Sequence, residues 1–356
     1  MAQALRLAER GLYTTSPNPR VGCVIARDGQ VIGEGFTQPA GQNHAEAEAL
    51  NAVRGRGGNA RGATAYVTLE PCSHYGRTPP CADALIAAGI NRVVVAIRDP
   101  NPLVAGEGIA RLRAAGIAVE CGLMESAARE LNIGFFMRMT RGTPWVRSKI
   151  AASLDGRTAL ANGASKWITG AAARQDVQHW RARSCAVLTG IGTVLADDPL
   201  LNVRDWEIPR QPLRAVVDNG LRLPPNARML EEKGGVVYTA SQDVKKIAAL
   251  ENVGARVVVL EDANGQVDVA RVLLDLAGKG CNEIMVEAGS KLNGALLQAG
   301  LVDELVLYLA PQFLGDMARG MARLGELTGL DQRIDFDWQD VRHAGKDLRI
   351  VARVKK

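Results

Sequence analysis

One short pattern limits what this chain can fold into more than any other feature. His44 and Glu46 stand two residues apart, and Cys72 and Cys81 follow further along, the first directly after Pro71. One imidazole and two thiolates are three good ligands for a catalytic zinc, and they leave the fourth tetrahedral position for water. Three such ligands hold one ion only if the fold brings these distant segments to a single point.

The segments around the pattern predict how that point is built. A helix is expected from Ala45 to Val53, directly after His44, and a strand from Ala65 to Leu69 leads into Cys72. A second helix is expected to begin near Cys81. Two helix N-termini would then converge on the metal, where their dipoles favour thiolate.

The pattern H-x-E, P-C, C is typical of zinc deaminases, in which the glutamate moves protons and does not bind the metal. Eight residues separate the cysteines here, where the general pattern has two. This longer insert, together with the segments 16–22 and 99–102, resembles the pyrimidine deaminases of riboflavin biosynthesis. The resemblance implies a fold like that of cytidine deaminase, with zinc on His44, Cys72 and Cys81 and Glu46 as the catalytic residue.

Three further residues are candidates for substrate binding in this half. Asn18 matches an asparagine that related deaminases use on substrate, and His74 and Arg77 lie in the long insert, where they would hold the pyrimidine or its phosphate. Turn and loop residues without a ligand are an equally open interpretation of all three. His74 is also a candidate fourth ligand of a structural zinc, although Glu46 fits an open site better.

The length of the chain and a helix-breaking segment predict two α/β domains. A chain of 356 residues is long for one core, and Gly142-Thr143-Pro144 breaks a predicted helix before a second series of alternating strands and helices. We therefore expect a zinc-dependent pyrimidine deaminase domain over 1–142, with α/β/α layers, and a second α/β domain over 143–356. The second half resembles the NADPH-dependent reductase that is fused to the riboflavin deaminases, whose fold is similar to dihydrofolate reductase.

Residues alone say less about the second site. No G-x-G-x-x-G follows a first strand, but glycine turns at 190–193 and 287–291 do follow predicted strands. Such turns cradle phosphate with backbone amides, and they are also common without any ligand. Lys149 and Asp155 are hypothesised to have a polar or proton-transfer role, and Ala164 departs from the glutamate usual in the family.

The resemblance assigns roles residue by residue. Nicotinamide-cofactor positions are Ala151, Trp167, Thr193, Asp197, Gly289, Ser290, Lys291, Leu292, Asn293, Gly294 and Ala295. Positions for the ribosylated substrate and its phosphate are Ser165, Arg181, Leu201, Arg204 and Glu287. Guanidinium groups suit a phosphate because they offer paired donors, and a surface ion pair is the alternative for either arginine.

The composition of the chain limits the kinds of molecule that it is expected to bind. A formal net charge of +5 and a 4% aromatic content do not favour nucleic acid, and no apolar run is long enough to span a membrane. There is no signal-peptide pattern, and six cysteines suggest a reducing cytoplasm. Four of these cysteines are expected to be buried thiols: Cys23, Cys121, Cys185 and Cys281. We expect a phosphoribosylated pyrimidine as substrate, and the family implies a homo-oligomer, with a dimer favoured.

The predicted function is a bifunctional enzyme of riboflavin biosynthesis. It would deaminate 2,5-diamino-6-(5-phosphoribosylamino)pyrimidin-4-one with zinc, and then reduce the ribose of 5-amino-6-(5-phosphoribosylamino)uracil with NADPH. Three alternatives stay open: a nucleic-acid base deaminase with an RNA-binding second domain, a deaminase whose second domain only oligomerises, and a zinc-binding scaffold. The scaffold leaves Glu46 unexplained.

Overall fold

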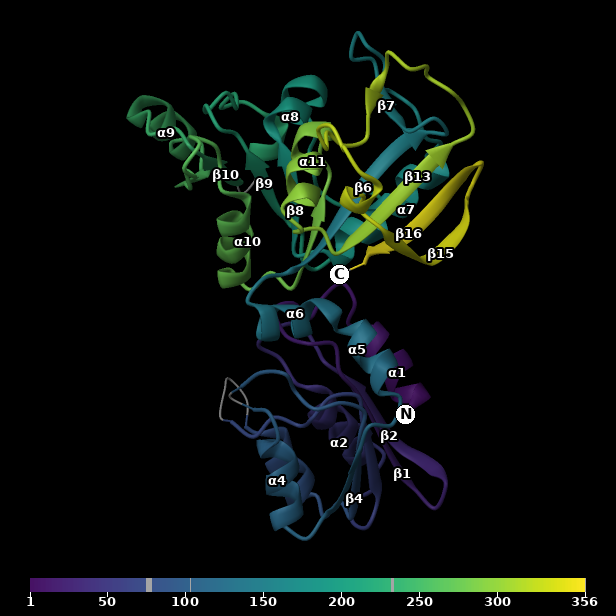
Figure 1. Ribbon diagram of the computed structural model, residues 1–356. Helices are drawn as coiled ribbons and strands as arrows, with labels where there is room; N and C mark the ends of the chain where they lie inside the picture. Colours follow the sequence, from purple (N-terminus) through teal and green to yellow (C-terminus); the bar gives the residue numbers. More distant parts are fainter. Residues whose placement is uncertain (75–78, 103, 232–233, 356) are drawn as a thin grey trace. The chain divides into compact units, whose positions relative to one another are not determined.

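The computed structural model describes residues 1–74, 79–102, 104–231 and 234–355. The chain divides into two compact units, Met1–Gly142 and Thr143–Lys356 (Figure 1). Gly142 ends the last helix of the first unit with a φ of +77°, in the left-handed region that glycine adopts without steric cost. None of the helices in the described ranges has both the length and the hydrophobicity needed to cross a lipid bilayer.

The first unit is built on one sheet whose described strands run in the order β2-β1-β3-β4-β5. β1 is antiparallel to β2 and β3, whereas β3, β4 and β5 are parallel. The strands are β1 (Gly22–Arg27), β2 (Gln30–Phe36), β3 (Thr64–Val67), β4 (Arg92–Val95) and β5 (Ala118–Cys121). The helices are α1 (Ala2–Glu9), α2 (Ala45–Gly55), α3 (Cys81–Ala87), α4 (Glu107–Ala114), α5 (Glu125–Leu131) and α6 (Ile133–Arg141).

Glycines set the spacing between this sheet and its helices. A Cβ at Gly35 of β2 would lie 2.4 Å from the Ala45 carbonyl oxygen of α2, so this helix packs directly on the strand backbone. A Cβ at Gly22 of β1 would instead meet α1, 1.9 Å from the Ala4 carbonyl oxygen. Gly35 pairs with Cys23, the neighbour of Gly22, and adjacent residues of a strand face opposite sides. The two helices therefore cover opposite faces of the sheet.

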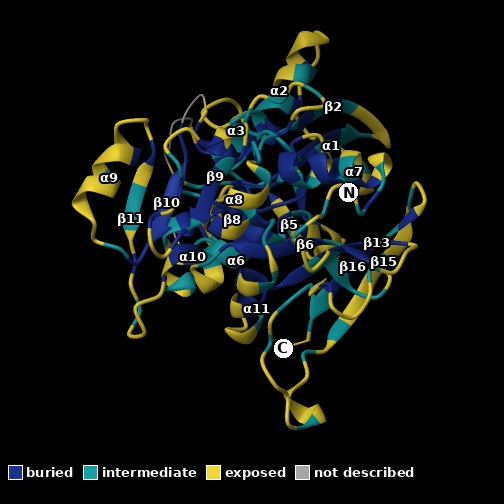
Figure 2. Ribbon diagram, turned by 90° about the horizontal axis from the view of Figure 1, so that it is seen from above, coloured by how far each residue is buried: buried dark blue, intermediate teal, exposed yellow. Residues whose placement is uncertain are grey.

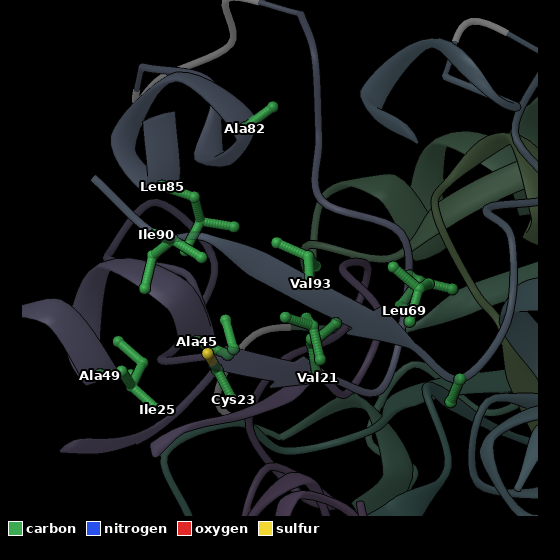
Figure 3. Close-up of a cluster of buried hydrophobic side chains, with 14 of the residues drawn as sticks. Val21, Cys23, Ile25, Ala45, Ala49, Leu69, Ala82, Leu85, Ile90 and Val93 are labelled. Carbon is green, nitrogen blue, oxygen red and sulfur yellow. The ribbon is translucent and has the colours of Figure 1, made fainter. Parts of the chain in front are cut away.

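Part of the core of the first unit lies between the sheet and α2. Cys23 and Ile25 of β1 are fully buried, and Figure 3 shows them beside Ala45 and Ala49 of α2. Small side chains at these positions let the helix approach closely. The packing fixes the start of α2, where His44 and Glu46 lie.

The second unit is built on a larger sheet whose described strands run in the order β11-β10-β9-β8-β12-β6-β13-β16-β15. The strands are β6 (Trp145–Ser153), β7 (Arg157–Ala159), β8 (Ala186–Gly190), β9 (Leu213–Val217), β10 (Val236–Thr239), β11 (Arg256–Val259), β12 (Glu283–Val286), β13 (Glu304–Ala310), β14 (Arg319–Gly320), β15 (Phe336–Ala344) and β16 (Asp347–Val354). The helices are α7 (Ala171–Arg183), α8 (Ile191–Asp197), α9 (Val244–Glu251), α10 (Val269–Gly278) and α11 (Ser290–Gln298), with short 3₁₀ turns η1 (Arg228–Leu230) and η2 (Leu330–Gln332).

The strands from β11 to β13 in this order are parallel, and β16 and β15 complete the sheet in antiparallel fashion. Parallel strands covered by helices are buried on both faces, as the dark colouring of β8, β9 and β10 shows in Figure 2. Ligands of such sheets usually bind beyond the carboxyl ends of the strands. Glu287 follows β12 at that end, and Gly190 ends β8 there.

The structure departs from two sequence-based expectations. The helical spacing of Ala2, Leu5, Ala8 and Leu12 predicts a helix over Met1–Leu12, but α1 ends at Glu9. Cys121, expected to be a buried thiol, is exposed at the end of the outer strand β5, so that prediction is wrong. Cys23, Cys185 and Cys281 are buried as expected.

Candidate active sites

The three predicted ligands of the first unit meet at one point. His44 is the N-cap of α2 and Cys81 is the first residue of α3, so two helix N-termini converge as predicted. Nδ1 of His44 lies 3.7 Å from Sγ of Cys72 and 3.5 Å from Sγ of Cys81. Tetrahedral zinc with ordinary Zn–S and Zn–N bonds would place these atoms about 3.6 Å apart. The donor set and its spacing therefore fit zinc.

The electrostatics of the ligands also suit a metal. Hydrogen bonds from Cys81 and His44 lower the pKa of the Cys72 thiol, which outweighs the effect of its burial. The backbone N–H of Cys81 donates to Sγ of Cys72 over 3.3 Å. The hydrogen bond with Cys72 raises the pKa of His44. These contacts favour the thiolate form of Cys72, which is the form that binds metal.

Glu46 lies in the first turn of α2, two residues from the ligand His44, and its side chain is buried. Burial, reinforced by the negative charge of Cys72, raises the pKa of Glu46 to about 7. A carboxylic acid with a pKa near neutrality can both accept and donate a proton at the working pH. Burial and pKa therefore give Glu46 the properties of a proton-transfer residue.

The second unit contains a large cavity of about 2350 Å³. Its wall includes the turn at Gly190–Thr193, where β8 leads into α8, and the turn at Gly289–Leu292, where β12 leads into α11. Backbone N–H groups at helix N-termini favour phosphate. The cavity is large enough for a dinucleotide together with a second small molecule.

A buried ion pair crosses the wall of this cavity. The Arg181 guanidinium of α7 binds the Glu287 carboxylate in two places, Nε to Oε1 over 2.5 Å and Nη2 to Oε2 over 2.9 Å. Burial opposes ionisation of Glu287, but the Arg181 charge and hydrogen bond lower its pKa to about 2. Nζ of Lys149 lies 4.0 Å from the same carboxylate, and burial lowers the pKa of Lys149.

Comparisons with known proteins place both units in one family. Residues 1–97 match the cytidine and deoxycytidylate deaminase zinc-binding region, and residues 144–349 match the RibD C-terminal domain. The riboflavin biosynthesis protein RibD of Escherichia coli (strain K12) is 50% identical over 98% of this chain and 96% of its own length. The chain belongs to the RibD family. It is a bifunctional deaminase and reductase of riboflavin biosynthesis, and the prediction of family and activities is confirmed.

Other members of the RibD family support the same conclusion. RibD of Haemophilus influenzae is 44% identical over 99% of this chain and 95% of its own length. A solved structure of Acinetobacter baumannii RibD has a TM-score of 0.92 at 47% identity, covering 100% of this chain and 98% of that one. The match of residues 144–349 to the RibD C-terminal domain removes the support for an RNA-binding second domain.

Most residues expected in the RibD reductase site do line the cavity. They are Ala151, Ser165, Trp167, Arg181, Thr193, Asp197, Leu201, Arg204, Glu287, Gly289, Ser290, Lys291, Leu292 and Ala295. Asn293 and Gly294 do not, and both pack inward. Nδ2 of Asn293 donates to the carbonyl oxygens of Ala288 and Met321 over 3.1 and 3.2 Å. A Cβ at Gly294 would lie 2.0 Å from the Arg323 carbonyl oxygen.

The other residues singled out in the sequence lie in different surroundings. Asn18 lies half-buried in the turn after α1, and its substrate role stays a prediction. His74 is exposed; burial raises the pKa of Asp99 to about 6, and the charge of His74 acts weakly in the opposite direction. Arg77 lies outside the described residues. Asp155 anchors a loop, because its carboxylate accepts the backbone N–H groups of Leu314 and Gly315.

Sequence reasoning missed two residues, one in each unit. Glu70 is buried beside the ligand Cys72, and its carboxylate accepts backbone N–H groups of Asp99, Gly106 and Ile109 over 3.0–3.2 Å. In the reductase unit, Arg228 is one of several cationic residues on the cavity wall. Glu70 stands directly before Pro71 in the zinc motif, which was a usable signal. Nothing local in the sequence marks Arg228.

Proposed function

We propose that the first unit deaminates 2,5-diamino-6-(5-phosphoribosylamino)pyrimidin-4-one and that the second reduces the ribose of 5-amino-6-(5-phosphoribosylamino)uracil with NADPH. The cluster of His44, Cys72 and Cys81 beside buried Glu46 carries the proposal. A Thermotoga maritima structure titled as a diaminohydroxyphosphoribosylaminopyrimidine deaminase and 5-amino-6-(5-phosphoribosylamino)uracil reductase supports the substrates, with 34% identity over 100% of this chain and a TM-score of 0.89.

In the deaminase unit we assign zinc binding to His44, Cys72 and Cys81. Zinc, when bound, supplies a Lewis acid that activates a water for attack on the ring carbon bearing the amine. Glu46 takes a proton from the attacking water and delivers protons to the ring nitrogen and to the departing ammonia. Its raised pKa suits this shuttle, since both protonation states are accessible near neutral pH.

In the reductase unit we assign the cofactor to the two glycine turns and the substrate to the wall that carries Ser165, Leu201 and Arg204. NADPH supplies the hydride that opens the ribose to a ribityl chain. Lys149 in the middle of β6 lies beside Glu287, which directly follows the neighbouring strand β12, and there the two side chains can hold polar groups of the sugar. The protein's contribution is to place the two reactants in contact and to exclude water.

A coupled assay tests the two-site proposal. Wild type is compared with Glu46→Ala and with Glu48→Ala, a control on the same helix whose carboxylate accepts a hydrogen bond from Asn43. Ammonia release and NADPH oxidation are followed separately on the diaminopyrimidine. We expect Glu46→Ala to retain zinc, release no ammonia and oxidise NADPH only when the deaminated intermediate is supplied. Ammonia release by this variant at the wild-type rate would refute the role of Glu46.

Failure of wild type to oxidise NADPH with either pyrimidine would refute the reductase assignment. Ammonia release and NADPH oxidation are separate signals, so each half of the proposal can fail alone. Absence of both signals in a zinc-loaded protein would refute the choice of substrate.

We also propose that the protein is a cytoplasmic homodimer. The outer strand β15 supports a second copy as partner, because Trp338 and Val341 on it are 68% and 55% exposed. All six cysteines are free, which suits a reducing compartment. Sedimentation of wild type beside Trp338→Lys measures the state, and a monomeric wild type would refute the dimer.

A further inference from the structure

Arg181 was expected to bind the substrate phosphate. Two edges of its guanidinium are already engaged, Nε and Nη2 by Glu287 and Nη1 by the Asn202 carbonyl oxygen over 2.9 Å. Its side chain is 9% exposed. A guanidinium binds phosphate best through a pair of parallel donors, and the pair on the Nε–Nη2 edge of Arg181 is taken by the carboxylate. Arg181 therefore acts here as a buried counter-charge for Glu287.

Arg204 is in a different situation. It is exposed on the cavity wall, and within the described ranges no carboxylate oxygen lies within 4.0 Å of its guanidinium. Partial burial lowers the pKa of Arg204, and the positive charges of Arg181 and Arg228 lower it further, although Asp205 and Glu287 act in the opposite direction. A cation near other cations and without an ion-pair partner favours an anion as its ligand.

The loop that carries Arg204 is held in one shape. Asp198 and Leu201 adopt φ angles of +41° and +53°, a left-handed conformation that is costly for residues other than glycine. Such strain persists only where the surroundings enforce it. Here the Gln211 side chain bonds both backbone groups of Val203, over 2.9 and 3.0 Å, and Gln178 accepts the Arg204 N–H. The Arg204 backbone is therefore presented at a fixed place.

Arg228 is attached to the same loop from another part of the chain. Its backbone N–H donates to Oδ1 of Asp198 over 2.9 Å, and it begins η1, whose next residues Met229 and Leu230 are buried. Its own side chain is exposed on the cavity wall. In the part of the chain that the structure describes, no acidic group forms an ion pair with it. Buried neighbours thus fix the Arg228 backbone beside the loop of Arg204, and its charge acts on the Arg204 guanidinium.

The charge of the whole cavity agrees with anionic ligands. Ten lysines and arginines but only six aspartates and glutamates are among the described residues that line it. We propose that Arg204 and Arg228 form a phosphate-binding pair on this wall, with Arg228 in the place that was expected for Arg181. The ligand is a phosphate monoester, either the ribosyl phosphate of the pyrimidine or the ribose phosphate of NADPH. The proposal rests on the reductase function proposed above.

Equilibrium binding tests the pair without relying on turnover. Dissociation constants are measured by calorimetry for the deaminated intermediate and its dephosphorylated nucleoside, and by fluorescence for NADPH and NADH. Wild type is compared with Arg228→Ala, Arg228→Lys and the control Arg271→Ala. Arg271 is exposed on α10 and is not among the residues that line the cavity, although Ala270 before it is, and its backbone N–H also donates to an aspartate, Asp268.

Loss of one charge-assisted contact should weaken binding about tenfold or more. If the pyrimidine supplies the phosphate, Arg228→Ala weakens binding of the intermediate and leaves the nucleoside unchanged. If the cofactor supplies it, the same variant weakens NADPH and leaves NADH unchanged. Arg228→Lys should keep part of the affinity, because it keeps the charge without the paired donors.

Two results would overturn the proposal. One is that Arg228→Ala binds all four ligands within about twofold of wild type, below the effect expected for a lost charge-assisted contact. The other is that it weakens phosphorylated and unphosphorylated ligands alike, which would indicate a general change of the cavity. Because binding is read directly, a reductase that turns over a different substrate would fail the coupled assay and still give a clear result for NADPH and NADH.

Discussion

The ion pair between Arg181 and Glu287 gives the sharpest prediction of stability. Glu287→Gln keeps the shape of the side chain but removes its charge, and it leaves the buried Arg181 guanidinium without a counter-charge. Breaking a buried pair by removing one partner is strongly destabilising, because the remaining charge stays desolvated. We expect the second unit to lose stability while the zinc site of the first unit is unaffected.

The magnitude follows from the pKa of Glu287, which is lowered from 4.5 to about 2. A shift of roughly 2.5 units corresponds to about 3 kcal/mol, at about 1.4 kcal/mol per unit. The Glu287 side chain is only 12% exposed, so solvent screening reduces this little. For a domain of this size, 3 kcal/mol corresponds to a fall in Tm of about 6–12 °C.

The lowered pKa of Glu287 also determines how the unfolding free energy changes with pH. A carboxylate whose folded pKa is depressed stabilises the fold above its unfolded pKa, and this stabilisation is lost as pH falls towards the folded value. The difference in unfolding free energy between wild type and Glu287→Gln should therefore be constant from pH 8 to pH 5. It should narrow below about pH 4.5.

Thermal unfolding followed by calorimetry at several pH values checks this prediction. Glu251→Gln, at the exposed end of α9, removes the same charge from the surface of the same unit and should leave Tm unchanged. Equal Tm values for wild type and Glu287→Gln at pH 7 would refute the reasoning. So would a difference that grows on acidification.

Three further predictions follow from the structure. Removal of zinc by a chelator should abolish ammonia release and leave NADPH oxidation on the deaminated intermediate intact, and added zinc should restore the first activity. Glu70→Gln should lower the unfolding free energy of the first unit by about 1–3 kcal/mol, since one buried N–H among those of Asp99, Gly106 and Ile109 loses its acceptor; chemical denaturation beside exposed Glu107→Gln measures the difference. A thiol reagent should label Cys121 first in the zinc-loaded protein, and mass spectrometry of Cys121→Ser should show that the rapid modification is gone.

The first site could be predicted from the sequence, because zinc binding restricts the types of residue that can serve as ligands. Few patterns other than a zinc site place a histidine, a glutamate two residues later and a cysteine after proline before a second cysteine, so His44, Cys72 and Cys81 could be predicted to meet. Short continuous apolar segments predicted most strands, because buried parallel strands are hydrophobic throughout. Apolar residues at helical spacing predicted most of the helices that the sequence revealed.

Other elements could not be predicted because their neighbours decide their exposure. β15 carries acidic, basic and aromatic residues with no clear alternation, and it forms a strand because β16 supplies its hydrogen-bonding edge. Cys121 stands in a strand that looks apolar from its first residues, but β5 is the outer strand of its sheet, so its thiol is exposed.

The sequence by itself determined the chemistry of the first site, since its ligands and Glu46 lie close together along two short segments that end at helix starts. Only the tertiary structure decided the charges of the second site. Strand order brings Glu287 to Arg181 across more than a hundred residues, which neutralises one arginine, whereas Arg204 has no ion-pair partner among the residues that the structure describes. Cross-strand neighbours of this kind depend on the order of strands in a sheet, and no local pattern of residues records that order.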